Sequence, residues 1–219
     1  MNEGIKRTPE EIGIAMSVAT MLVLTGAVSI DVDNPRPFTS GIQGPLFTDC
    51  THLLGLPGQR SLVANMLTER VRKVTTNYNY DSVMGVPTGA PSFATMVADR
   101  LGKKNPYWNE KKGRMEGNFK SGDKVVIIED MGTTGRSTIA FAEKVREWGG
   151  IVEKVVLIAS YGLPEIDENF RNAGLEYASL TDMDAIYEVL KKRGKLSDRE
   201  TEVLKVWMQN PRAWRPNQT

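Results

Sequence analysis

Residues 124–138 read KVVIIEDMGTTGRST: an apolar run, two acidic residues, and then a loop of glycine, threonine and serine. The apolar residues 125–128 are β-branched and do not alternate with polar ones, which is typical of a parallel strand covered on both faces. Open α/β sheets bind their ligands at the carboxyl ends of such strands. We therefore predict that Glu129 and Asp130 lie at the ligand-binding edge of a sheet.

The loop after the acids has the composition of an anion-binding turn. Its glycines allow backbone N–H groups to turn inward, its hydroxyls add donors, and a helix is predicted to begin near Ser137 with its N-terminus towards the loop. Two adjacent carboxylates can accept hydrogen bonds from vicinal sugar hydroxyls. The pattern predicts a site for a phosphorylated sugar; the alternative is a glycine-rich turn without a ligand, which leaves the two acids unexplained.

Strand and helix patterns alternate along the middle of the chain. A predicted strand over residues 81–87 breaks at PTGAP and is followed by a helix over residues 92–101. A second unit spans residues 124–148, and a third runs from a strand at 152–160 into a helix around 167–173. Repeated strand–helix units with short connections predict an α/β fold with a doubly wound, mainly parallel sheet.

The apolar stretch over residues 12–30 carries no charge, so it has to be considered as a membrane span or a signal sequence. The stretch is preceded by a helix start: Thr8 is the N-cap, Pro9 the first-turn proline and Glu11 the capping-box partner. Acidic residues thus stand where a signal peptide would have basic ones. Gly26 is a suitable helix stop. We predict a buried helix of a soluble protein.

The length of 219 residues is enough for one large core, so we expect a single domain over residues 1–219. Ser197 is the predicted cap of a C-terminal helix. Within the domain we expect an N-terminal helix and hood (1–58), a core (59–180) and a C-terminal helical extension (181–219).

Charge and cysteine content narrow the class of protein. The net charge is +1 and the isoelectric point is about 7.8, which gives no reason to expect nucleic acid or a membrane as partner. Cys50 is the only cysteine and His52 the only histidine, so an intrachain disulfide and a Cys/His zinc site are excluded, and a cytoplasmic location is expected. A catalytic Cys50–His52 pair lacks an orienting carboxylate nearby, and a packed thiol is the preferred interpretation.

The chain resembles the type I phosphoribosyltransferases, because VVIIEDMGTTGRST is similar to their signature for phosphoribosyl diphosphate (PRPP). It is most similar to orotate phosphoribosyltransferases. The further segments that carry this resemblance are LTGAV at 24–28, PFTSGIQGPLFTD at 37–49, MGVPTGAPSFATMVADRLGK at 84–103, and the short connection MEGNFKSGDKVVIIED. The resemblance implies a type I phosphoribosyltransferase fold with a small N-terminal hood.

The resemblance also implies a role for each part of the PRPP site. In this family the two acids, here Glu129 and Asp130, hold the ribose hydroxyls. The 5-phosphate would bind to the loop formed by Gly132, Thr133, Thr134, Gly135, Arg136 and Ser137. Pyrophosphate would be held by the backbone loop of Pro87, Thr88, Gly89 and Ala90.

The implied activity is Mg²⁺-dependent transfer of the phosphoribosyl group from PRPP to a pyrimidine base, with orotate favoured and orotidine 5′-monophosphate and diphosphate as products. Mg²⁺ would bind mainly through PRPP oxygens, so no metal site built from protein ligands is expected. The base attacks the ribose directly, and no protein nucleophile is needed. The family resemblance further implies a homodimer.

A cation over the diphosphate is a further requirement of this chemistry. The polar segment 105–123, with charges of both signs and three glycines, is a candidate mobile loop or flap. The resemblance assigns Lys111 or Lys112 as the leaving-group cation and Arg114 as a helper, in a loop over residues 109–118 that is shorter than in the family and has no histidine. The alternative is a solvated basic turn.

The base pocket departs from the family pattern. Where the family has a lysine before Ser-Gly, this chain has Thr39, and the segment LIASYGLPE at 157–165 lacks the family's arginine. Thr39, Phe47 and Tyr161 are the residues expected to shape the pocket. Two alternatives therefore stay open: transfer to another base, and a regulatory protein that binds PRPP with little transferase activity.

Overall fold

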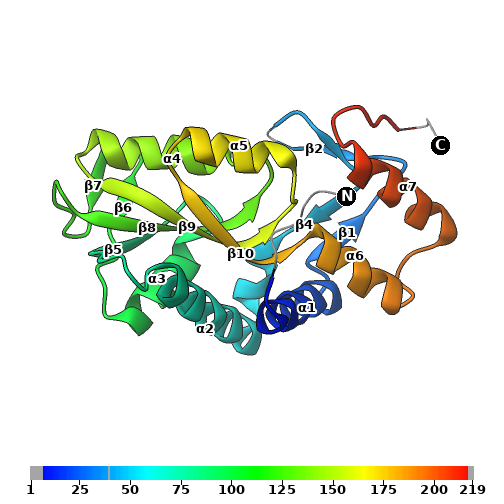
Figure 1. The fold of residues 1–219 in the computed structure, drawn as a ribbon, viewed down its shortest axis with the longest axis horizontal. Helices are drawn as coiled ribbons and strands as arrows, with labels where there is room; N and C mark the ends of the chain where they lie inside the picture. Colours follow the sequence, from blue (N-terminus) through cyan, green and yellow to red (C-terminus); the bar gives the residue numbers. More distant parts are fainter. Residues whose placement is uncertain (1–6, 39, 217–219) are drawn as a thin grey trace.

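The computed structural model describes residues 7–38 and 40–216. Its centre is a parallel sheet with the strand order β10–β9–β8–β5 (Figure 1). The strands are β5 (Ser82–Gly85), β8 (Lys124–Gly132), β9 (Ile151–Ser160) and β10 (Glu176–Asp182). This arrangement confirms the α/β class and the parallel sheet predicted from the strand–helix units, and it adds β10, which the sequence analysis did not predict.

Helices cover both faces of this sheet. Three helices, α1 (Pro9–Leu24), α2 (Pro57–Val74) and α3 (Pro91–Leu101), lie on one face, and α4 (Arg136–Glu147) and α5 (Pro164–Asn172) lie on the other (Figure 1). Val126 and Ile128 pack into the cluster under the first face, whereas Val125 and Ile127 pack into the second. All four are fully buried, which explains why this strand has no polar alternation.

The hood over the sheet consists of short antiparallel strands. Strand β1 (Val28–Ile30) pairs with β4 (Leu46–Thr48), and β2 (Arg36–Pro37) pairs with β3 (Gln43–Gly44). A 3₁₀ helix, η1 (Cys50–Gly55), then leads into α2. Helices α6 (Met183–Lys192) and α7 (Asp198–Gln209) lie beside the hood at the same end of the molecule (Figure 1).

The first helix begins and ends as predicted. The Thr8 side chain accepts a hydrogen bond from the Glu11 N–H, and the Glu11 carboxylate accepts one from the Thr8 N–H at 2.9 Å. The helix ends at Leu24, and Gly26 takes a positive φ of 82°. Val18 and Leu22 are fully buried, so the apolar stretch belongs to the core. None of the described helices is both long and apolar enough to cross a membrane.

The polar segment predicted as a loop contains an antiparallel hairpin instead. Strand β6 (Tyr107–Asn109) pairs with β7 (Arg114–Glu116), and the turn between them carries the two lysines. Trp108 packs edge-on against Trp148, which follows α4, with 6.4 Å between ring centroids. This aromatic contact attaches the hairpin to the end of α4. The charged residues of the segment gave no indication of it.

The C-terminal helix holds the hood in place. Its N-terminus has the predicted cap, a box formed by Ser197 and Glu200. Trp207 is almost fully buried, and its indole N–H donates to the Gln43 carbonyl in the hood at 2.8 Å. Its ring also packs against Phe38 and Tyr161, with centroid distances of 6.4 and 6.0 Å. One side chain therefore links α7, the hood and the end of β9.

Candidate active site

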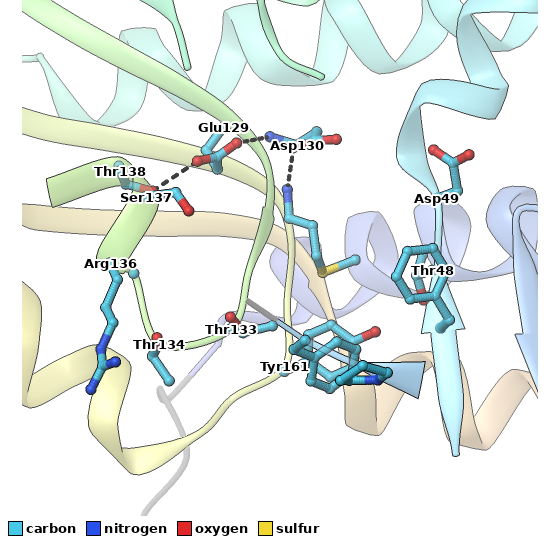
Figure 2. Close-up of a pocket in the computed structure, with 15 residues that line it drawn as sticks. Thr48, Asp49, Glu129, Asp130, Thr133, Thr134, Arg136, Ser137, Thr138 and Tyr161 are labelled. Carbon is cyan, nitrogen blue, oxygen red and sulfur yellow. Dashed lines mark hydrogen bonds between the residues drawn. The ribbon is translucent and has the colours of Figure 1, made fainter. Parts of the chain in front are cut away.

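A cavity of about 270 Å³ lies between the hood and the carboxyl end of β8 (Figure 2). One end is polar and the other is largely aromatic. The polar end is lined by Glu129, Asp130, Met131, Thr133, Thr134, Gly135, Arg136, Ser137 and Thr138, and the other end by Pro37, Phe38, Phe47, Thr48, Asp49 and Tyr161. The structure thus brings the acid pair, the Gly/Thr/Ser loop and two of the three predicted base-pocket residues into one cavity.

The acid pair differs in exposure. Glu129 is 5% exposed; its carboxylate accepts hydrogen bonds from the Thr138 hydroxyl at 2.9 Å and from the Asp130 N–H at 3.1 Å (Figure 2). The carboxylate of Asp130, which is half-buried, accepts one from the Met131 N–H at 3.0 Å. Burial, together with the neighbouring Asp130, raises the pKa of Glu129 well above its ordinary value. Asp130 is therefore the more accessible acceptor for a ligand hydroxyl.

The loop after β8 is a tight turn that only glycine allows. The strand continues to Gly132, two residues beyond the acid pair, and α4 begins at Arg136, one residue earlier than predicted. Gly135 has a φ of 76°, and a Cβ there would collide with the ring of Phe170 on α5. At Gly132 a Cβ would lie 2.8 Å from Ile166 Cδ1. Helix α5 therefore fixes the path of this loop.

Asn169 on α5 adds a polar tie that the sequence analysis missed. Its side-chain amide donates to the backbone carbonyl of Thr134 at 2.8 Å. Thr134 is 1% exposed and lies in the middle of the loop. No local pattern could have identified this residue, because it lies 35 positions further along the chain than its partner.

The PTGA loop lies beside the acid pair. It follows β5, whose neighbour in the sheet is β8, and a Cβ on Gly89 would lie 2.5 Å from Asp130 Cγ. Gly85 is equally constrained, since its Cβ would lie 2.6 Å from the Ala90 backbone. The loop over residues 87–90 is thus packed against the predicted ribose-binding acids, although it is not part of the cavity wall.

The aromatic end of the cavity is built from the hood and the end of β9. The ring centroids of Phe38 and Tyr161 are 4.7 Å apart, and the Tyr161 hydroxyl donates to the Leu46 carbonyl at 3.2 Å. Burial raises the pKa of Tyr161, so this hydroxyl stays protonated. Phe47 lines the cavity, Phe38 lines it too but was not among the predicted pocket residues, and Thr39 lies outside the described residues.

The predicted leaving-group cations do not reach this cavity. Lys111, Lys112 and Arg114 lie on the β6–β7 hairpin. The Glu116 carboxylate binds Lys112 at 2.8 Å and Arg114 at 2.9 Å. The contact with Lys112 is the largest of the interactions that hold the pKa of Glu116 far below its usual value. Arg136 is the single cation on the described cavity wall, and Figure 2 shows its side chain pointing away from the acid pair.

The described part of the chain holds no group of three or more His, Cys, Asp or Glu side chains that could bind a metal ion. Cys50 is fully buried in η1, and burial raises the pKa of its thiol. The packed-thiol interpretation of Cys50 is thus confirmed.

Comparisons with known proteins agree with this geometry. No model of a protein family matches the chain. Orotate phosphoribosyltransferases of Porphyromonas gingivalis and Levilactobacillus brevis are 30% and 33% identical to it, over 90% and 91% of this chain and 96% and 97% of theirs. Among solved structures, the Aeropyrum pernix orotate phosphoribosyltransferase is 26% identical, with a TM-score of 0.68 over 81% of this chain and 99% of its own.

A second structural neighbour, UMP synthase of Leishmania donovani, has a TM-score of 0.79 at 23% identity, over 90% of this chain and 43% of its own. The parallel sheet with helices on both faces is the fold of a type I phosphoribosyltransferase. Within that class, the chain belongs to the orotate phosphoribosyltransferase family.

The buried carboxyl of Glu129 predicts a pH-dependent stability. Its pKa is raised by folding, so the folded state holds this proton more tightly, and the free energy of unfolding falls as pH rises from about 4.5 through the shifted pKa. Glu129→Gln removes this loss. We expect the variant to be more stable than the wild type at pH 8, by on the order of 1 kcal/mol, and equal to it or less stable at pH 5.

Chemical unfolding of both proteins between pH 5 and 9 measures this difference. Glu143→Gln, on the exposed side of α4, is the matched control and should leave the pH profile unchanged, since exposed ion pairs contribute little. Equal pH slopes for Glu129→Gln and the wild type would contradict the account.

Asn169 is expected to act through the position of the loop. We predict that Asn169→Ala weakens PRPP binding about fivefold to tenfold, and that Asn169→Asp weakens it more, because a carboxylate would face the Thr134 carbonyl. The Michaelis constant for the acceptor base should not change. Asn172→Ala, at the exposed end of the same helix, is the control. Unchanged PRPP affinity in both Asn169 variants would show that the loop does not need this tie.

Proposed function

We propose that the protein transfers the phosphoribosyl group of PRPP to orotate, forming orotidine 5′-monophosphate and diphosphate. The observation that supports it most directly is the composition of a single cavity: an acid pair, an anion-binding loop at a helix N-terminus, and an aromatic end. Membership of the orotate phosphoribosyltransferase family supports the same activity, because the relatives bear that name.

In this proposal the polar end of the cavity holds the ribose 5-phosphate. Backbone N–H groups and hydroxyls over residues 133–137, at the N-terminus of α4, donate to the phosphate oxygens. Asp130, with Glu129 beside it, accepts hydrogen bonds from the ribose hydroxyls. The PTGA loop, packed against Asp130, offers its backbone to the diphosphate.

The reaction is a displacement at C1 of the ribose. The C1–O bond to diphosphate breaks with its electron pair leaving on oxygen, a ring nitrogen of the base forms the new bond to C1, and the N–H proton of that nitrogen passes to water. The protein contributes by holding both reactants in line and by placing charge where it develops. Phe47 and Tyr161 present the surface against which a planar base can lie.

Mg²⁺ is proposed as the cofactor, held mainly through PRPP. The acid pair at the end of β8 fits this role, because Mg²⁺ takes one or two carboxylates and fills its remaining positions with water and substrate phosphate oxygens. Bound there, Mg²⁺ would neutralise charge on the diphosphate. Glu129 and Asp130, the acids proposed to bind the ribose hydroxyls, would help to hold it directly or through water.

A homodimer is proposed on the family resemblance, with Lys111, Lys112 and Arg114 acting on the diphosphate. The β6–β7 hairpin would have to move, or serve the cavity of a partner subunit, because its cations lie away from the cavity of their own chain. Ile12 on α1 and Leu62 on α2, 52% and 46% exposed, are apolar side chains that a partner could cover. The cytoplasmic location and the division at residues 58 and 180 stay predictions.

One observation favours a second candidate. The lysine and the arginine that the family pattern places at the base are absent here, at Thr39 and in residues 157–165. A different base could therefore be the acceptor, or the chain could bind PRPP as a regulator with little turnover.

Diphosphate release separates these functions. The protein is incubated with PRPP, Mg²⁺ and, in turn, orotate, uracil and a purine, and nucleotide formation is followed in parallel. We expect release and orotidine 5′-monophosphate with orotate. Release with a different base alone would reassign the acceptor, and PRPP binding without release under any base would support the regulatory protein.

The hairpin cations have their own test. We expect the double variant Lys111→Ala, Lys112→Ala to lower kcat about 100-fold, because the leaving group loses its counter-charge, with a smaller effect on PRPP affinity. Lys191→Ala with Lys192→Ala, two exposed lysines on α6, removes the same charge elsewhere and should leave kcat unchanged. Full turnover in the hairpin variant would refute the assignment.

A further inference from the structure

Positive charge is missing from the wall at the aromatic end of the cavity. The side chains there come from the hood and from Tyr161, which follows β9, and the one Asp or Glu among them is Asp49. Glu129 and Asp130 add further carboxylates at the polar end. Orotate carries a carboxylate of its own, so an acceptor of this kind needs a cation to offset the repulsion and the loss of water.

Arg36 on β2 is placed to supply that cation. Its guanidinium carbon lies 5.2 Å from the ring centroid of Phe47, a cavity-lining residue. Pro37, the next residue along β2, also lines the cavity. Arg36 is therefore at the rim of the aromatic end.

Strand pairing holds the backbone of Arg36, and its side chain is exposed. Strand β2 pairs with β3, Arg36 opposite Gly44, and the Phe38 ring lies so close to Gly44 that a Cβ would collide with it. Phe38 in turn packs against Trp207. In contrast, no hydrogen bond or ion pair from the Arg36 side chain to another described residue is present, whereas Arg70, Arg114 and Arg199 each bind a carboxylate.

A guanidinium over an aromatic face keeps its N–H groups available at its edges. Such a fork matches the two oxygens of a carboxylate. A pyrimidine lying against Phe47 with its carboxylate at the rim would present those oxygens to Arg36. Thr39 and residues 157–165, where the family pattern has its cations, are not needed for this contact.

We propose that Arg36 is a specificity-determining residue that binds the carboxylate of the acceptor base. The proposal rests on the proposed function, since it presumes an anionic pyrimidine. Arg36 would then be the cation that pairs with the carboxylate of the base, and it comes from the β2–β3 hairpin of the hood, a segment to which the family resemblance assigned no cation.

Binding of the nucleotide product tests the contact without turnover. Orotidine 5′-monophosphate and UMP differ by the carboxylate alone, and their affinities are measured by calorimetry for the wild type, Arg36→Ala, Arg36→Lys and Arg193→Ala. We expect Arg36→Ala to weaken orotidine 5′-monophosphate binding about tenfold and to leave UMP binding unchanged. Arg36→Lys should keep part of the discrimination, because a point charge remains without the fork.

Arg193→Ala removes an exposed charge after α6 and is the control for net charge. An unchanged ratio of the two affinities in Arg36→Ala overturns the proposal, and so does an equal loss for both nucleotides, which would indicate a structural role. A wild type without any preference for orotidine 5′-monophosphate also overturns it. The diphosphate-release assay tests the proposed function separately. It measures transfer to orotate, whereas the binding experiment measures only the contact between Arg36 and the carboxylate.

Discussion

The turn at Gly135 has room for a hydrogen atom and nothing larger, because the ring of Phe170 lies directly against it. This turn takes the chain from β8 into α4 and aims the N-terminus of α4 at the cavity. Without it the backbone donors of the loop and the carboxylates of the strand would not face the same space. The fixed path of this loop, supported by α5 through Phe170 and Asn169, is the constraint on which the rest of the site depends.

The acid pair is an arrangement that favours binding over stability. Glu129 is buried beside Asp130, and the loss of water together with the neighbouring carboxylate disfavours the ionised form of Glu129 and raises its pKa. The Thr138 hydroxyl and the Asp130 N–H offset part of that cost. Ligand hydroxyls that donate to the pair would offset more of that cost, so binding of a sugar diol would relieve an unfavourable interaction in the free protein.

Local patterns predicted much of the fold and one end of the site. The unbroken β-branched run of residues 125–128 identified the central strand, and Thr8 with Glu11 identified the start of α1, because both signals lie within a few residues. The hairpin of β6 and β7 was not predicted, because its many charged residues are typical of a loop and its aromatic contact is with Trp148, which is distant in sequence. Asn169, Phe38 and Arg36 were missed for the same reason: their roles come from tertiary contacts, which no spacing in the chain reveals.

We propose that the end of β8 and the start of α4 form one site for the ribose 5-phosphate. A crystal structure of the protein with PRPP measures this directly. The account predicts the 5-phosphate within hydrogen-bond distance of the backbone N–H groups over residues 133–137, with the ribose hydroxyls on Asp130 and Glu129. A phosphate bound elsewhere, for instance among Arg70, Arg72 and Lys73 between α1 and α2, would contradict it.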